Sequence, residues 1–116
     1  MRFYYHCDIP CKREIIEGVY FNHRGFGIVI NPNSKIGEGT DIQHSVTIGE
    51  TAKGCPTIGK YCHIGARAVV IGNVKIGDNV TIGAGAVVVH DVPDNCTVVG
   101  VPAKIIKDRD LFLHEM

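Results

Sequence analysis

The sequence predicts a single all-β domain, a coil of short parallel strands, and three features of the chain lead to this prediction. An aliphatic residue returns every six positions through most of the sequence, glycine often follows it, and a small or β-branched residue stands four positions after it. A helix repeats its apolar face at about 3.6 residues and a strand at about 2, so neither fits as one long element. One short strand and one bend do fit, and three such units close a triangular coil. The aliphatic residues on this period are Ile30, Ile36, Ile42, Ile48, Ile58, Ile64, Val70, Ile76, Ile82 and Val88.

The aliphatic residue and the small residue of each unit are expected to point inward, which makes Cys62 a core residue. Glycine and asparagine are expected to supply backbone conformations that a bend needs and that a Cβ resists. Stacked coils then pair as parallel strands about 4.8 Å apart. The stacking predicts three columns: Ile9, Ile30, Ile48, Val70 and Val88; Ile15, Ile36, Ile58 and Ile76; and Phe3, Phe21, Ile42, Ile64 and Ile82.

Two insertions interrupt the six-residue period. The step from Phe21 to Ile30 is nine residues, which places three extra residues within 23–27. The step from Ile48 to Ile58 is ten, which places four extra residues within 50–56. Function concentrates on such loops over a regular scaffold, so both are candidate parts of a site.

Composition narrows the class of protein. The chain has 116 residues, room for one domain, and its twelve basic and twelve acidic residues balance, which disfavours nucleic acid and anionic membranes as partners. No apolar run reaches transmembrane length, and the first residues do not begin a signal peptide. Five cysteines without disulfide-rich spacing suit a reducing compartment. We therefore expect a cytoplasmic protein.

The regular pattern ends after Val92, where Pro93, Gly100 and Pro102 break it. We expect the coil domain to span 1–106 and a C-terminal tail to span 107–116. The mixed charged and apolar residues of that tail leave open a short helix or a frayed end.

One acid and two histidines fall near the first insertion. Asp8 closes the unit that starts at Phe3, and His23 lies on the unit that starts at Phe21, one coil above. His44 takes the equivalent place on the following coil. An imidazole beside a carboxylate is a general base that titrates near neutral pH, so the pair of Asp8 and His23 is a candidate catalytic dyad.

The dense repeat of Leu/Ile/Val, Gly, two variable residues and a small residue resembles the hexapeptide-repeat acyltransferases. The resemblance implies a left-handed parallel β-helix, the opposite hand to the general rule for parallel crossovers. It also implies a homotrimer with active sites between subunits. Self-association along one flat side also suits a chain that buries a limited core alone.

The segment from 8 to 106 resembles more specifically the serine O-acetyltransferases and their short relatives that acetylate sugars of surface polysaccharides. In that group an Asp-Ile pair opens the repeats and a histidine follows fifteen residues later, as Asp8-Ile9 and His23 do here. A Gly-Ile-Val-Ile run comes next, at 27–30. Further matching segments are Val46–Gly49, Ile64–Ala66, Val70–Asn73, Ile82–Ala86 and Gly100–Lys104.

This resemblance implies an enzyme that moves an acetyl group from acetyl-CoA to a hydroxyl of a small, serine-like amino acid. His23 would be the general base, Asp8 would hold its ring in one tautomer, and no metal is expected. The candidate contacts of coenzyme A are Gly65, Ala66, Gly83, Ala84 and Lys104, and those of the acceptor are His44 and Asn22.

Three departures from the serine-specific pattern favour a second acceptor class, the sugars. Cys55-Pro56 stands where the family has His-Pro, and Asn31-Pro32 stands where it has Gly-Glu. Asn22 replaces an acid that commonly precedes the histidine. A protein of another class, a non-catalytic trimeric binding module, also fits the repeat. A zinc enzyme on this scaffold needs three converging histidines, and His63 falls on a different column from His23 and His44.

Overall fold

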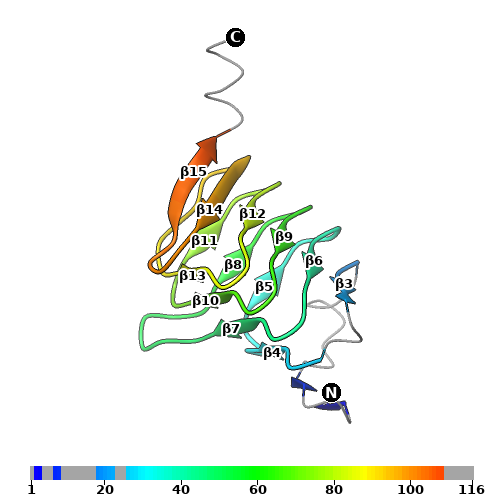
Figure 1. Cartoon of the computed structure of the whole chain (residues 1–116). Helices are drawn as coiled ribbons and strands as arrows, with labels where there is room; N and C mark the ends of the chain where they lie inside the picture. The colour runs from blue at the N-terminus through cyan, green and yellow to red at the C-terminus, as the bar shows by residue number, and fades with distance from the viewer. Residues whose placement is uncertain (1, 4–6, 9–17, 23–25, 109–116) are drawn as a thin grey trace.

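The computed structural model describes residues 2–3, 7–8, 18–22 and 26–108, in which short strands wind upward from β3 and β4 to β14 and β15 (Figure 1). Most strands have two or three residues, because each side of the triangle is only that long before the chain bends. The strands are β1 (Arg2–Phe3), β2 (Cys7–Asp8), β3 (Tyr20–Phe21), β4 (Val29–Ile30), β5 (Lys35–Ile36), β6 (Asp41–Ile42), β7 (Thr47–Gly49), β8 (Thr57–Ile58), β9 (His63–Ile64), β10 (Val69–Ile71), β11 (Lys75–Ile76), β12 (Thr81–Ile82), β13 (Val87–Val88), β14 (Cys96–Val99) and β15 (Lys104–Asp108).

The strands form three sheets, one on each side of the prism. Sheet A has the order β1-β2-β4-β7-β10-β13, sheet B the order β15-β14-β12-β9-β6-β3, and sheet C the order β11-β8-β5. Pairing is parallel and in register within the coil, so Ile48 lies between Ile30 and Val70 in sheet A. The predicted fold class, an all-β left-handed parallel β-helix, is confirmed, and so are the predicted columns from Phe21 to Val88.

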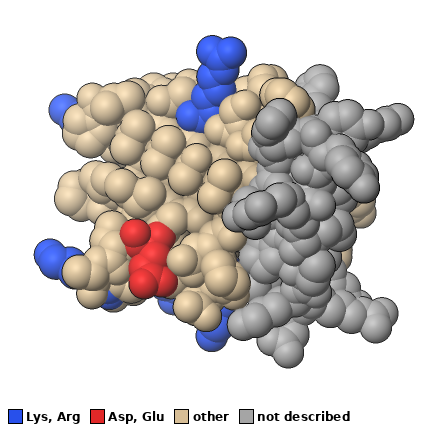
Figure 2. Space-filling view, turned by 90° about the horizontal axis from the view of Figure 1, so that it is seen from below, with Lys and Arg blue, Asp and Glu red and all other residues tan. Residues whose placement is uncertain are grey.

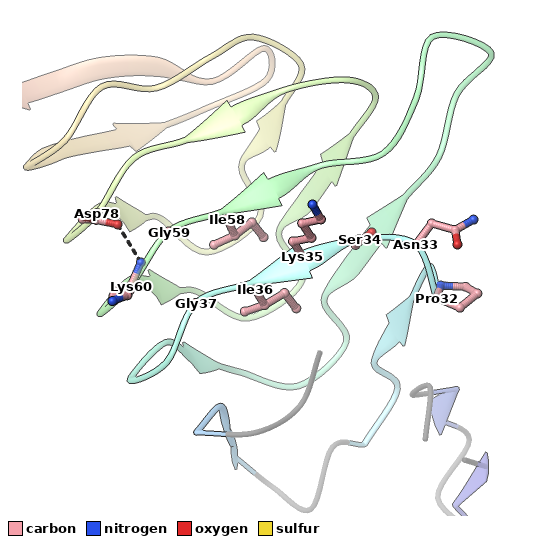
Figure 3. A pocket seen from close by; sticks show the side chains of 10 residues that line it. All are labelled: Pro32, Asn33, Ser34, Lys35, Ile36, Gly37, Ile58, Gly59, Lys60 and Asp78. Carbon is pink, nitrogen blue, oxygen red and sulfur yellow. Dashed lines mark hydrogen bonds between the residues drawn. The ribbon is translucent and has the colours of Figure 1, made fainter. Parts of the chain in front are cut away.

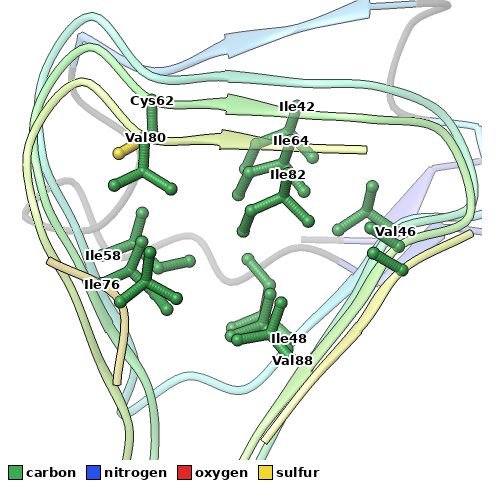
Figure 4. Packing of buried hydrophobic residues seen from close by; sticks show 14 of the residues in the cluster. Ile42, Val46, Ile48, Ile58, Cys62, Ile64, Ile76, Val80, Ile82 and Val88 are labelled. Atoms are coloured by element: carbon green, nitrogen blue, oxygen red, sulfur yellow. The ribbon is translucent and has the colours of Figure 1, made fainter. Parts of the chain in front are cut away.

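The core is a stack of aliphatic side chains along the axis of the prism (Figure 4). Ile42, Ile64 and Ile82 lie one above another and are completely buried. The small positions of the repeat are also inside, and Cys62 is 1% exposed, as predicted. Burying these side chains removes apolar surface from water, which is the main force that holds such short strands together.

Two polar side chains, Ser34 and Thr40, are buried together with this core. Thr40 is completely buried, and its Oγ1 donates to the carbonyl oxygen of Gly59 at 2.8 Å and accepts from the Cys62 N–H at 3.2 Å. Both partners lie on the next coil, so this hydroxyl ties two coils together from inside.

The bends lie at a different position of the repeat from the glycine that directly follows the aliphatic residue. The backbone turns through a positive φ at the third residue after the aliphatic one, for example at Ser45, Tyr61 and Asn79. Glycine and asparagine do supply bends there, as expected, at Gly39, Gly85 and Asn79. The glycine directly after the aliphatic residue, such as Gly59, has no such angle and has another role. At Gly59 the reason for a glycine is space, because an added Cβ would lie 2.6 Å from the carbonyl oxygen of Gly77 on the next coil.

The two ends of the coil also differ from the regular pattern. β1 pairs antiparallel with β2 in sheet A, so Phe3 does not join the column of Phe21 as predicted. The physical reason is the antiparallel pairing itself, in which Phe3 lies opposite Cys7 and Arg2 opposite Asp8. At the other end β15 pairs antiparallel with β14 and reaches Asp108. The division at 106 stays a prediction, because 109–116 lie outside the described residues.

Candidate functional site

The edge between sheets B and A collects most of the predicted site residues. We call the successive bends at 22, 43–45, 65–67 and 83–85 the B–A edge. Backbone hydrogen bonds run along it, from the Arg67 N–H to the His44 carbonyl oxygen (3.0 Å) and from the Gly85 N–H to that of Ala66 (2.9 Å). His44, Ala66 and Ala84 therefore stack at equivalent places of three coils.

The first insertion is attached to the start of this edge. His23 lies outside the described residues, but the chain on both sides of it is described. Asn22 is half-buried directly after β3, whose Tyr20 N–H donates to the Thr40 carbonyl oxygen at 2.9 Å. On the far side, the Phe26 carbonyl oxygen accepts from the Ser45 N–H at 2.8 Å. The insertion is therefore anchored at both ends to the coil that carries His44.

Asp8 lies in sheet A, in the strand that begins the stack. Its backbone pairs with Val29 of β4, and β4 in turn pairs with β7. Contact between Asp8 and His23 stays a prediction, because the structure describes only the backbone of Asp8 and does not describe His23.

The predicted coenzyme contacts have two different surroundings. Gly65 is buried, and a Cβ there would lie 2.6 Å from the backbone nitrogen of Ala84, so packing alone explains this glycine. Ala66 is half-buried and Ala84 is exposed. Lys104 is exposed and pairs with Val99. Small side chains at an edge leave the backbone open to a thin ligand, which suits the arm of coenzyme A.

The second insertion carries a polar cluster that our reading of the sequence identified only in part. The Asn31 amide nitrogen donates to Glu50 Oε2 at 3.2 Å. The Cys55 thiol lies 3.3 Å from Asn31 Oδ1 and 3.4 Å from Glu50 Oε2. Cys55 and Asn31 stood out in the sequence as departures from the family, but Glu50 did not. The usable signal was its place at the start of an insertion whose last residues are Cys55 and Pro56.

This cluster favours a neutral thiol. Desolvation raises the pKa of Cys55, and the hydrogen bond and negative charge of Glu50 raise it further. A protonated thiol is a donor, so Cys55 can donate to either oxygen acceptor beside it. Cys55 is therefore a structural donor rather than a thiolate nucleophile.

A second histidine and aspartate meet on the outer face of sheet B. His63 Nδ1 lies 2.6 Å from Asp41 Oδ1, because the two residues are paired in register on β9 and β6. Both side chains are partly exposed, at 46% and 34%. The sequence analysis did not predict this pair, although the spacing of 22 residues between successive coils in this region would have placed the two side by side.

The grooves of the described surface lie away from the B–A edge. One, of about 520 Å³, crosses sheet C between Pro32 and Asp78 (Figure 3). The Asp78 carboxylate there accepts the Lys60 N–H at 2.8 Å. Another, of about 680 Å³, lies beside the second insertion at Thr51 and Lys53. None of the predicted site residues lines either groove.

Charge is dispersed over the face seen in Figure 2, where lysine and arginine side chains lie apart at the margins of a mostly uncharged surface. Among the residues that the structure describes, no three His, Cys, Asp or Glu side chains are grouped as a metal site would need. In the same described ranges, no helix is long and apolar enough to cross a membrane.

A parallel β-helix with a six-residue period and a ladder of small residues at one edge defines the hexapeptide-repeat class of proteins. The family model for the bacterial transferase hexapeptide, six repeats, matches residues 55–90. Residues 55–90 of the chain therefore match the hexapeptide repeats of this group of transferases.

Serine acetyltransferases are prominent among the proteins similar to this chain. That of Synechococcus elongatus is 44% identical over 94 residues, 78% of this chain and 38% of the relative. That of Helicobacter pylori is 42% identical over 113 residues, 93% of this chain and 66% of the relative. The crystal structure of the Neisseria gonorrhoeae enzyme in complex with serine has a TM-score of 0.71 and 45% identity, covering 75% of this chain and 36% of that one. A serine acetyltransferase in complex with CoA has a TM-score of 0.71 and 38% identity, covering 76% and 37%.

The chain spans between about a third and two thirds of the length of these relatives. The activity of the whole relatives is therefore a proposal for this chain.

Proposed function

We propose that this protein is an acyltransferase that moves the acetyl group of acetyl-CoA to the hydroxyl of a serine-like amino acid. The observation that carries the proposal is sequence identity above 40% to serine acetyltransferases over most of the chain. The solved relatives bound to serine and to CoA support the two substrate classes.

The proposed chemistry needs one base and no covalent acyl-enzyme. A hydroxyl is a weak nucleophile at neutral pH, so His23 takes its proton as the oxygen attacks the thioester carbonyl. Asp8 keeps the imidazole in the tautomer that accepts this proton and stabilises the imidazolium. The tetrahedral intermediate then expels the coenzyme A thiolate, which recovers the proton from His23.

The proposed coenzyme site is the B–A edge. Ala66 and Ala84 let the pantetheine arm lie close to the backbone, and Lys104 provides a positive charge for the phosphates. His44 and Asn22 flank the anchored first insertion, which places them beside the proposed acceptor site.

We also propose a homotrimer, because apolar side chains line the outer face of sheet A. Val29 is 44% exposed there, and Val69 and Val87 of the same sheet are half-buried. Light scattering is expected to give about three times the chain mass of 12.6 kDa. A stable monomer would contradict an active site between subunits.

The test of the function follows release of free thiol from acetyl-CoA with L-serine, L-homoserine and a panel of sugars. His23→Ala is expected to lower turnover by about 10²- to 10⁴-fold, the usual contribution of a general base. Asp8→Asn is expected to lower turnover while leaving coenzyme binding nearly intact. The matched control is His63→Ala, which removes an exposed imidazole from sheet B and should leave turnover unchanged.

Three results would change the assignment. Loss of activity in His63→Ala would indicate that His63, on sheet B, is the general base. Transfer to sugars alone would assign the polysaccharide O-acetyltransferase activity. Absence of thiol release with every acceptor would favour the non-catalytic trimeric module.

A further inference from the structure

The cluster of Asn31, Glu50 and Cys55 has a chemical property that the proposed mechanism does not use. Glu50 is exposed, whereas Asn31 and Cys55 are half-buried beside it. Asn31 and Cys55 both contact Oε2 of its carboxylate, at 3.2 Å and 3.4 Å. Its carboxylate is thus held in one place from one side and stays open to solvent.

The described contacts of this carboxylate are with uncharged groups. Asn31 and the protonated Cys55 thiol are neutral donors, and neither neutralises an anion. Within the part of the chain that the structure describes, the ion pairs of lysine, arginine and histidine involve Glu38 and Asp41, not Glu50. A fixed anion with neutral supports is complementary to a cation, and such charge-assisted hydrogen bonds are stronger than neutral ones.

The cluster begins where strands of sheet A end, and sheet A also contains the proposed catalytic acid. Asp8 pairs with Val29, and Asn31 is two residues further along that strand direction. With strands about 4.8 Å apart and about 3.3 Å per residue, the Cα atoms of Asp8 and Asn31 are about 8 Å apart. A serine-like acceptor together with a hydrogen bond of about 2.8 Å at each end spans a comparable distance.

We infer that the Glu50 carboxylate, positioned by Asn31 and Cys55, binds the ammonium group of the acceptor and so selects a hydroxylated primary amine. This inference rests on the proposed function and names its acceptor class. A sugar without an amine gains nothing from this carboxylate.

The test compares two acceptors that differ only in the amine. L-serine and 3-hydroxypropanoate share a hydroxyl and a carboxylate, and only L-serine carries an ammonium group. Glu50→Gln is expected to raise the KM for L-serine about ten- to hundredfold, with the KM for acetyl-CoA unchanged within about twofold. The preference for L-serine over 3-hydroxypropanoate is expected to fall by the same factor.

Two further variants separate charge from folding. Glu50→Asp keeps the charge on a shorter side chain and is expected to restore part of the L-serine preference. Glu38→Gln removes a carboxylate that is 61% exposed and pairs with Lys60 instead, so it is the matched control and should change neither KM. Thermal melting of each variant checks that the fold is intact.

The inference and the proposed function fail in different ways. An unchanged preference in Glu50→Gln, or an equal loss with both acceptors, would overturn the role of Glu50 while acetyl transfer stands. If the protein shows no turnover, calorimetric titration with L-serine measures the binding of the acceptor directly. Binding that weakens about tenfold or more in Glu50→Gln would support the ammonium site without the enzyme, and binding that does not depend on Glu50 would overturn the inference.

Discussion

Replacing Gly59 by alanine tests whether the spacing of the coils or the shape of the bends demands glycine after each aliphatic residue. A Cβ on Gly59 would lie 2.6 Å from the carbonyl oxygen of Gly77 and 2.7 Å from its carbonyl carbon. Both are backbone atoms of the next coil, so relief requires the coils to separate. Such a separation weakens two hydrogen bonds, from the Gly59 N–H to the Ile76 carbonyl oxygen at 2.9 Å and from the Lys60 N–H to Asp78 at 2.8 Å.

Two hydrogen bonds at about 1 kcal/mol each, together with overpacking, give an expected loss of about 2–3 kcal/mol in the free energy of unfolding. Urea unfolding measures it directly, and the melting temperature is expected to fall by about 10 °C. Gly49→Ala is the matched control, since Gly49 also follows an isoleucine but a Cβ there would meet only side-chain atoms, Ile71 Cγ2 at 3.3 Å and Thr47 Cγ2 at 4.0 Å. Its loss is expected to stay below about 1 kcal/mol. Equal losses in the two variants would refute the role of coil spacing.

Three further predictions concern single polar groups. Thr40→Val is expected to lower the free energy of unfolding in urea by about 2 kcal/mol, because it leaves the Gly59 carbonyl oxygen and the Cys62 N–H without the Thr40 hydroxyl. A loss below about 0.5 kcal/mol would contradict the role of Thr40 in joining the two coils. Desolvation and Glu50 raise the pKa of Cys55 above its ordinary value of 9.0, so the folded state favours the neutral thiol. The stability that this preference contributes is present below about pH 9 and is lost as the pH rises through the raised pKa. Cys55→Ser is therefore expected to flatten the decline in unfolding free energy measured above about pH 9, and an unchanged slope would count against it. Asp41→Ala is expected to change stability by less than about 1 kcal/mol, since its pair with His63 is partly exposed, and a larger loss would show that the pair is structural.

The stacking of the coil was predictable because it depends on a repeat that the chain displays directly. Once Ile42, Ile64 and Ile82 occupy the same position of the period, parallel in-register pairing follows from their burial. Phe3 shows where this reasoning stops. Phe3 pairs antiparallel with Cys7 in sheet A, and this contact decides its place instead of the period.

The stacking of the predicted site residues along the B–A edge could be predicted from the sequence, but the polar contacts around Glu50 could not. His44, Ala66 and Ala84 stack as the period requires. Glu50 was missed because its importance lies in contacts with Asn31 on another coil and with Cys55 across an insertion. A hydrogen bond between residues that the period does not relate leaves no pattern in the sequence.

The sequence by itself determined the fold class, the inward columns and the positions of both insertions, because each is a matter of spacing along the chain. Only the tertiary structure decided why Gly59 must be glycine, which residue turns each bend and which polar groups surround Glu50. The physical reason is that close approach and hydrogen bonding depend on distances between coils to within a few tenths of an ångström, and a repeat fixes only their order.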